Sequence, residues 1–171
     1  ISKGEAEGLK AELRHAGGLT LRTNPDILNR VWADRPPVPL NKVEIHPLQY
    51  AGESVAEKLS RIRNEMRRAG ASCMLVTQLD DIAWTLNLRG SDVHCTPVFV
   101  AWLIICEESA TLYIKEEKLT AEVKDYLRAE GVAIDDYCNI IAALNDCDAP
   151  TMLIDPSTVN STLAQPRGNF T

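Results

Sequence analysis

The sequence predicts an α/β fold in which a mixed β-sheet is flanked by helices. Two observations predict it. Short apolar runs suited to strands alternate with segments whose apolar residues recur every three or four positions, and such alternation is typical of α/β domains. The runs Val98 to Ile105 and Thr111 to Ile114 are separated by the turn Glu107-Glu108-Ser109, which predicts an antiparallel hairpin between them.

The helix with the clearest signal begins after Ser54. Glu57 follows three residues later, which is the capping-box pattern, and Gly70 ends the helix. One apolar stripe runs along it, formed by Val55, Leu59, Ile62 and Met66. Further helices are expected over residues 5–16, 26–32, 80–86, 116–129 and 140–144, the second of them capped by Asn24-Pro25. Further strands are expected over residues 19–22, 73–76, 132–134 and 152–154.

Residues 33–50 differ in character from the segments on either side. They contain the stiff string Arg35-Pro36-Pro37-Val38-Pro39, and Pro47 follows soon after. Proline fixes φ and has no N–H to donate, so such a segment suits neither a helix interior nor an inner strand. We therefore predict that it is a linker and the best domain boundary in the chain.

Charge and hydropathy exclude two classes of partner. The 171 residues carry a net charge of −6, which argues against a protein that follows nucleic-acid phosphates. No apolar run approaches the roughly 20 residues needed to cross a bilayer. We therefore expect neither a nucleic acid nor a membrane as a partner. The five cysteines include no C-x-x-C pair, and reduced thiols in a cytoplasmic protein are the simplest expectation.

The residues supply no complete catalytic or metal-binding motif. Gly90-Ser91-Asp92 lacks the small residue that follows the serine of a nucleophile elbow. Asp80-Asp81 could form a catalytic acidic pair, but capping of the helix that begins there explains it better. None of the three histidines is at metal-ligand spacing from another: His15, His46 and His94. One chemically dense loop remains, residues 87–97.

Several strings, in order between about residues 27 and 127, resemble cytosolic aminopeptidase P, a metallopeptidase family that removes an N-terminal residue preceding proline. Thr96 stands where family members often carry Asn, so no role is assigned to that end of the loop. The strings are Val31-Trp32-Ala33-Asp34-Arg35-Pro36-Pro37, Tyr50-Ala51-Gly52-Glu53-Ser54-Val55-Ala56-Glu57-Lys58-Leu59, Leu79-Asp80-Asp81-Ile82-Ala83-Trp84, Asn87-Leu88-Arg89-Gly90-Ser91-Asp92-Val93 and Pro97-Val98-Phe99.

The resemblance implies a protein with two similar N-terminal α/β domains and a C-terminal peptidase domain. In that last domain the family holds two Mn²⁺ ions between two Asp, two Glu and one His, and no such set can be matched here. Residues 1–36 would then be the tail of the first domain plus the linker, and residues 37–171 the second, creatinase/prolidase N-terminal-like domain. We expect no cofactor in this chain, and no peptidase activity from the chain alone.

The resemblance also implies a function. This chain would help to shape substrate access and domain assembly in a cytoplasmic Xaa-Pro aminopeptidase. Its partners would be the C-terminal peptidase domain of the same protein and proline-containing peptides, with a homodimer left open. The substrate-channel candidates are Arg89, Ser91, Asp92 and His94. Arg89 could offer a fixed cation to a peptide carboxylate or carbonyl, oriented by Asp92. Alternatively, Arg89 and Asp92 pair only to hold the loop.

Two other functions stay open at this point. The stiff proline segment suits a purely structural or oligomerisation module that spaces domains. An independent α/β domain that binds a small molecule is the third reading.

Overall fold

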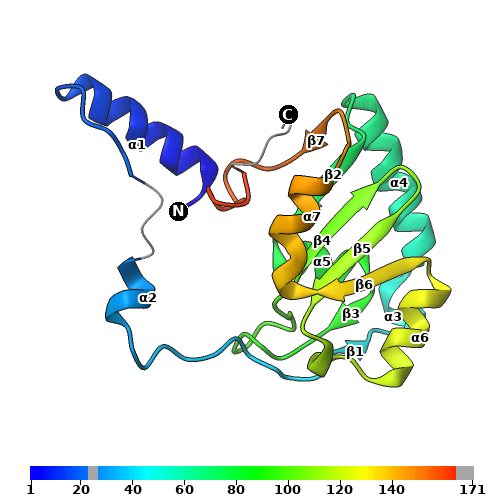
Figure 1. Ribbon diagram of the computed structural model, residues 1–171. Coiled ribbons are helices and arrows are strands. Elements are labelled where there is room, and N and C mark those ends of the chain that lie inside the picture. Colours follow the sequence, from blue (N-terminus) through cyan, green and yellow to red (C-terminus); the bar gives the residue numbers. More distant parts are fainter. Residues whose placement is uncertain (23–26, 165–171) are drawn as a thin grey trace. The chain divides into compact units, whose positions relative to one another are not determined.

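The computed structural model describes residues 1–22 and 27–164 (Figure 1). These residues form two compact units, each described here by itself. Among the described residues, the helical unit comprises those up to 38 together with 155–164, and the sheet unit comprises residues 39–154. The assignment of residues 1–36 and 37–171 to two family domains stays a prediction.

The helical unit is organised around helix α1 (Lys3–His15). The hydroxyl of Ser2 accepts a hydrogen bond from the Glu5 amide, while the Glu5 carboxylate accepts one from the Ser2 amide at 2.8 Å, which completes a capping box. Lys3 N–H donates to the carbonyl of Val159 at 2.9 Å, so α1 is tied to the segment after residue 155. Helix α2 (Ile27–Val31) matches the short helix predicted there.

Two predictions for the helical unit fare differently. The strand predicted over residues 19–22 is wrong, because that backbone forms no strand and Leu19 is exposed. The segment has only two apolar residues, Leu19 and Leu21, and the described part of this unit contains no strand for it to pair with. The cap predicted at Asn24-Pro25 lies outside the described residues.

The sheet unit contains a five-stranded mixed sheet in the order β6-β5-β4-β2-β7. Strand β4 is antiparallel to both of its neighbours, β2 and β5, whereas the β2–β7 and β5–β6 pairs are parallel. The predicted α/β fold with a mixed sheet is thus confirmed. The strands are β2 (Cys73–Val76), β4 (Trp102–Cys106), β5 (Ala110–Ile114), β6 (Val132–Asp136) and β7 (Met152–Leu153).

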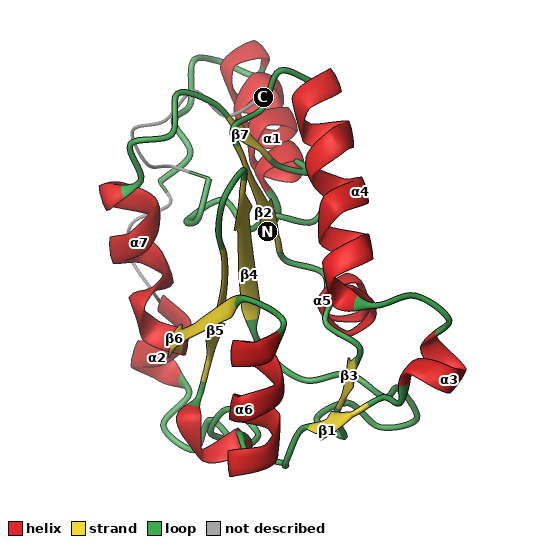
Figure 2. Ribbon diagram, turned by 90° about the vertical axis from the view of Figure 1, so that its right-hand side faces the viewer, coloured by secondary structure: helices red, strands yellow, loops and turns green. Residues whose placement is uncertain are grey.

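Helices cover both faces of this sheet, and Figure 2 shows α4 and α7 on opposite sides of it. The helices are α3 (Leu48–Ala51), α4 (Val55–Arg68), α5 (Leu79–Thr85), α6 (Ala121–Ala129) and α7 (Ile140–Asp146), with the 3₁₀ turns η1 (Glu116–Lys118) and η2 (Tyr137–Asn139). The single helix predicted over residues 116–129 is divided. Thr120 caps α6 by accepting a hydrogen bond from the Val123 amide, so η1 remains a separate turn.

The linker predicted over residues 33–50 is shorter than expected. Strand β1 (Glu44–Ile45) pairs antiparallel with β3 (Leu88–Arg89), and α3 begins at Leu48. Val43 is buried in the core of the sheet unit. Each proline excludes regular structure only at its own position. The residues between Pro39 and Pro47 can therefore form β1 and pack against the core.

The long apolar run after residue 97 is not all strand. Val98, Phe99 and Ala101 are buried in the core, but β4 begins only at Trp102. The first part of the run therefore packs as irregular chain beneath the loop that precedes it.

A disulfide joins Cys73 of β2 to Cys106 of β4, so the prediction that all cysteines are reduced is wrong. The two residues are direct register partners, with their Cα atoms 4.1 Å apart, which brings the sulfur atoms within bonding reach. Sequence spacing could not reveal this pairing, because it depends on the register of two strands whose cysteines are 33 residues apart.

Within the described residues, no helix is both long and apolar enough to span a membrane.

We predict that replacing Ser54 with Ala destabilises the sheet unit. The Ser54 hydroxyl caps α4 by accepting from the Glu57 amide, and loss of such a cap costs about 1 kcal/mol in the free energy of unfolding. Hydrogen bonds from the Ser54 side chain and backbone lower the pKa of Glu57 in the folded chain. The stabilisation that these bonds contribute is therefore complete above the pKa of Glu57 in the unfolded chain, and it is lost as the pH falls through the lower pKa of the folded chain. Urea unfolding at pH 7 and pH 3 measures both effects. Ser60→Ala, at an exposed site on the same helix, is the control and should be nearly neutral.

We also predict that reduction of the disulfide destabilises the chain. Release of a cross-link that closes 33 residues should lower the free energy of unfolding by about 2–4 kcal/mol. Urea unfolding with and without dithiothreitol measures the difference, and the Cys73→Ala/Cys106→Ala variant should no longer respond to the reductant. An equal response in that variant would show that the effect comes from elsewhere.

Candidate functional site

The candidate loop, residues 87–97, begins directly after α5 and leads through β3 toward the buried residues before β4. Its first residue, Asn87, is buried and has a φ of 49°, in the left-handed region that asparagine tolerates better than most residues. Gly90 lies so close to the segment beyond the loop that a Cβ there would be 2.7 Å from the Cβ of Phe99. The two arms of the loop are therefore packed directly against each other.

Arg89 is fixed at the base of the loop. Its Nη1 donates to the carbonyl oxygens of Leu88 at 2.8 Å and of Ala83, in α5, at 3.2 Å. Its backbone pairs with Glu44 across the β1–β3 ribbon. Asp92 is not its partner, so the alternative in which these two side chains pair to hold the loop is wrong. A guanidinium has five N–H donors, and the two carbonyls leave others available.

Asp92 points into the protein, with its side chain fully buried. One carboxylate oxygen, Oδ2, accepts from the Val100 amide at 2.7 Å and forms an ion pair with Lys118, whose side chain is also fully buried. The backbone amide of Asp92 donates to the carbonyl of Val98 at 3.2 Å. Asp92 thus fastens the loop from inside.

Ser91 and His94 face the solvent on the same loop. The Ser91 carbonyl accepts from Asn41 Nδ2 at 2.8 Å, while Val93 and Thr96 form an antiparallel bridge across the tip. The structure therefore divides the four predicted residues: Ser91 and His94 lie on the outer edge, whereas Arg89 and Asp92 are held at the base and inside.

A shallow groove of about 360 Å³ borders the tip of this loop. One wall comes from the start of α5 and the residues just before it, the other from the loop tip and Val98. Its lining combines hydroxyl, amide and carboxylate groups with apolar side chains. The lining residues are Thr77, Gln78, Leu79, Asp80, Val93, Thr96 and Val98.

A buried lysine that the sequence analysis did not single out supports the start of the loop. Lys58 of α4 is only 1% exposed, and its Nζ donates to Asn87 Oδ1 at 2.6 Å and to the Trp84 carbonyl at 2.7 Å. The ammonium group also lies 4.3 Å from the centroid of the Trp84 ring. Burial lowers the pKa of Lys58, and repulsion from Arg89 and Arg61 adds to this effect while Glu53 opposes it.

The sequence signal that could have revealed Lys58 is its position within the apolar stripe of α4. It falls three residues after Val55 and one before Leu59, on the face of α4 that packs against the core. Lys118 lies in η1, where no helical period applies, and its burial leaves no comparable trace in the sequence.

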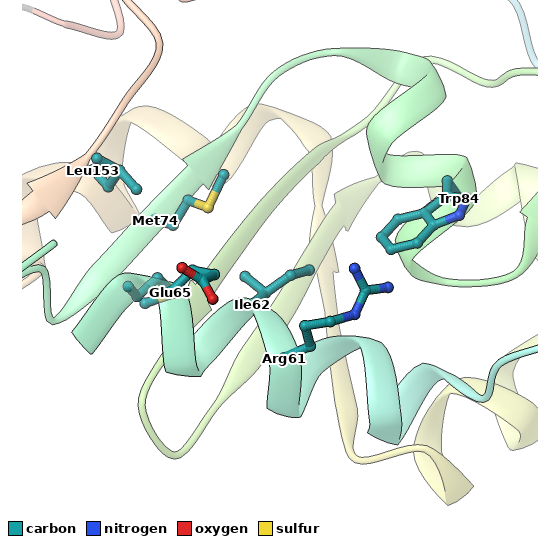
Figure 3. A pocket seen from close by; sticks show the side chains of 7 residues that line it. Arg61, Ile62, Glu65, Met74, Trp84 and Leu153 are labelled. Carbon is teal, nitrogen blue, oxygen red and sulfur yellow. The ribbon is translucent and has the colours of Figure 1, made fainter. Parts of the chain in front are cut away.

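Trp84 also forms the wall of an apolar pocket of about 220 Å³, shown in Figure 3. Arg61 and Glu65 of α4 stand beside it, and Arg61 is already bound to Glu53, with Nη2 2.6 Å from Oε2. The other lining residues are Ile62, Met66, Met74 and Leu153. With almost no free polar group, this pocket offers no group suited to chemistry.

Among residues 1–22 and 27–164, no group of three or more His, Cys, Asp or Glu side chains is placed to hold an ion.

Comparison with known proteins gives close matches over most of the chain. It is 41% identical over 140 residues to Aminopeptidase P2 of Arabidopsis thaliana, covering 80% of this chain and 20% of that protein. It is 40% identical over 141 residues to the probable Xaa-Pro aminopeptidase P of Ajellomyces capsulatus, covering 82% of this chain and 22% of that protein. The chain thus spans about a fifth of the length of these relatives.

Among solved structures, the X-prolyl aminopeptidase of Caenorhabditis elegans, described as a cytosolic enzyme with a di-nuclear active site, has a TM-score of 0.84. The likeness covers 99% of this chain and 30% of that one at 19% identity, and it shows the fold. The creatinase/prolidase N-terminal domain matches residues 34–169, which is most of the chain. The chain belongs to the creatinase/prolidase N-terminal domain family.

Proposed function

We propose that this chain is a non-catalytic N-terminal part of an Xaa-Pro aminopeptidase, and that its candidate loop forms one wall of the path taken by the substrate. The relatives named Xaa-Pro aminopeptidase P and Aminopeptidase P2 support the activity of the whole protein. The observation that carries the role of the loop is its division into two sides. Its base is braced by buried contacts, while Ser91 and His94 are exposed on the tip whose residues Val93 and Thr96 border a groove of about 360 Å³.

The substrate class follows from this proposal. The whole protein would release the N-terminal residue from peptides with proline in the second position, and two Mn²⁺ ions in a separate peptidase domain would supply the Lewis acid and the activated water. The Caenorhabditis elegans enzyme, described as cytosolic and di-nuclear, supports a cytoplasmic location and a pair of metal ions. Residues 1–36 and 37–171 would belong to successive domains, and assembly with the peptidase domain, or as a homodimer, would be their second task.

Arg89 is the residue best placed to contact a peptide. Its guanidinium is only partly buried and is oriented by two carbonyl groups, which lowers the entropy lost when a third acceptor binds. A peptide carbonyl or C-terminal carboxylate is such an acceptor. Asp92 does not orient it directly, and contributes by holding the rest of the loop.

We predict that Arg89→Ala in the aminopeptidase lowers kcat/KM for an Xaa-Pro peptide about 10-fold or more, because a hydrogen bond to a charged group contributes about 1.5–3 kcal/mol. Steady-state kinetics measure the change, and thermal unfolding checks that the fold survives. Arg128→Ala is the matched control, since Arg128 is exposed on α6 and pairs only with the exposed Asp125. An unchanged kcat/KM in Arg89→Ala, at unchanged stability, would remove this residue from the substrate path.

We further predict that the purified 171-residue chain hydrolyses no Xaa-Pro peptide, even with added Mn²⁺. No described cluster of carboxylates and histidines is placed to organise the ions and the attacking water. The assay follows release of the N-terminal residue by chromatography, with a full-length aminopeptidase P as the positive control. Metal-dependent turnover by the pure chain would contradict the proposal that catalysis takes place elsewhere.

A further inference from the structure

The strongest unexplained feature of the sheet unit is the buried ion pair between Lys118 and Asp92. Both side chains are completely shielded from solvent, and they come from segments 26 residues apart. Removing two charges from water is costly, and apolar side chains of similar size often stabilise a fold equally well. Stability alone therefore does not account for this pair. Apolar residues could fill the same space, but they could not form directional contacts between defined atoms of the two segments.

Lys118 is the point at which three segments meet. Its Nζ binds Asp92 of the candidate loop and donates to the carbonyl of Pro39 at 3.3 Å. Its own carbonyl accepts from the Val43 amide at 3.0 Å, and the carbonyl of the preceding Glu117 accepts from Lys42 Nζ at 2.6 Å. The Lys118 ammonium therefore joins the loop to Pro39, and the main-chain carbonyls of η1 bind Lys42 and Val43 farther along the segment 39–43.

Asp92 transmits this constraint to the loop. Its Oδ2 binds both Lys118 and the Val100 amide, so the charge on Lys118 fixes the point where the loop returns to the core. The other carboxylate oxygen, Oδ1, is buried and has no hydrogen-bond partner within the described part of the chain. Asp92 therefore holds the loop through Oδ2, and the position of this atom decides where the loop returns to the core.

We propose that Lys118 is a positioning residue for the aminopeptidase reaction, acting through Asp92 to hold the candidate loop in the shape that the substrate meets. This inference rests on the proposed function of the loop. Lys118 touches no substrate. It fixes the outer edge that carries Ser91 and His94, and a loop displaced by 1 Å is enough to weaken substrate positioning.

The test uses the double variant Asp92→Leu/Lys118→Met, which removes both charges and leaves no unpaired ion in the core. Two measurements are made. Amide hydrogen exchange in the 171-residue chain should show faster exchange at Val100, whose acceptor is lost, with Leu103 and Ile105 of β4 still protected. In the aminopeptidase, kcat/KM should fall about 10-fold, mainly through a higher KM, while the melting temperature changes little.

A matched control is available in the same region. Lys124 and Glu116 form an ion pair at the surface, between α6 and η1. The variant Glu116→Leu/Lys124→Met should leave both the exchange at Val100 and the kinetics unchanged. Should the buried double variant fail to fold, Asp92→Asn/Lys118→Met also removes both charges but keeps an acceptor for the Val100 amide. It should give smaller changes in the same two measurements, and faster exchange at Val100 would then report the loss of Lys118 rather than the loss of the acceptor.

The outcomes separate this inference from the proposed function. Unchanged exchange at Val100, or normal kinetics in a variant whose loop has been loosened, overturns the role of Lys118. If Arg89→Ala lowers kcat/KM in the same enzyme, the proposed function stands even when this inference fails. If neither Arg89→Ala nor the double variant alters the kinetics, the loop is not part of the substrate path and both fail.

Discussion

Two buried ammonium groups set the constraint on which the candidate loop depends. Lys58 lies beneath the start of the loop and Lys118 beneath its middle, and each must replace the water it has lost with hydrogen bonds of defined direction. Lys58 does so with a side-chain amide and a main-chain carbonyl at the start of the loop, and Lys118 with a carboxylate farther along it. Because an unsatisfied buried cation is costly, each of these contacts resists movement of the chain that supplies it.

The consequence is a loop with little freedom at its base. Asn87 accepts from Lys58 through Oδ1 and donates through Nδ2 to the carbonyl of Glu53 at 2.9 Å, so the entry to the loop is tied to the residues that precede α4. The close approach of Gly90 to Phe99 leaves no room for a side chain between the two arms, so they pack in direct contact. A surface loop supported in this way can present polar groups without the large loss of entropy that ordering a flexible segment requires.

Local patterns in the sequence predicted most of the secondary structure, and the reason is visible in particular elements. Helix α4 was predicted with its cap because Ser54 and Glu57 act within one turn. The β4–β5 hairpin was predicted from its short turn. Features that depend on distant partners were not predictable: the Cys73–Cys106 bond needs the β2–β4 register, and the Lys118–Asp92 pair joins segments that are 26 residues apart in the sequence. The site was predicted as a loop, but not as a loop with an inner and an outer side.

The same dependence on distant partners explains why the suggested pair between Arg89 and Asp92 is wrong. Opposite charges three residues apart on one loop suggest a local pair, yet each finds a partner elsewhere. Within the described residues, the partly buried guanidinium of Arg89 binds carbonyl groups and no carboxylate, whereas a pair with Asp92 would have compensated its positive charge. We therefore infer a second effect of Lys118, in addition to its proposed role in holding the loop. Under the proposed function, Lys118 would occupy Asp92 and so leave the positive charge of Arg89 available to an acidic or carbonyl group of a peptide.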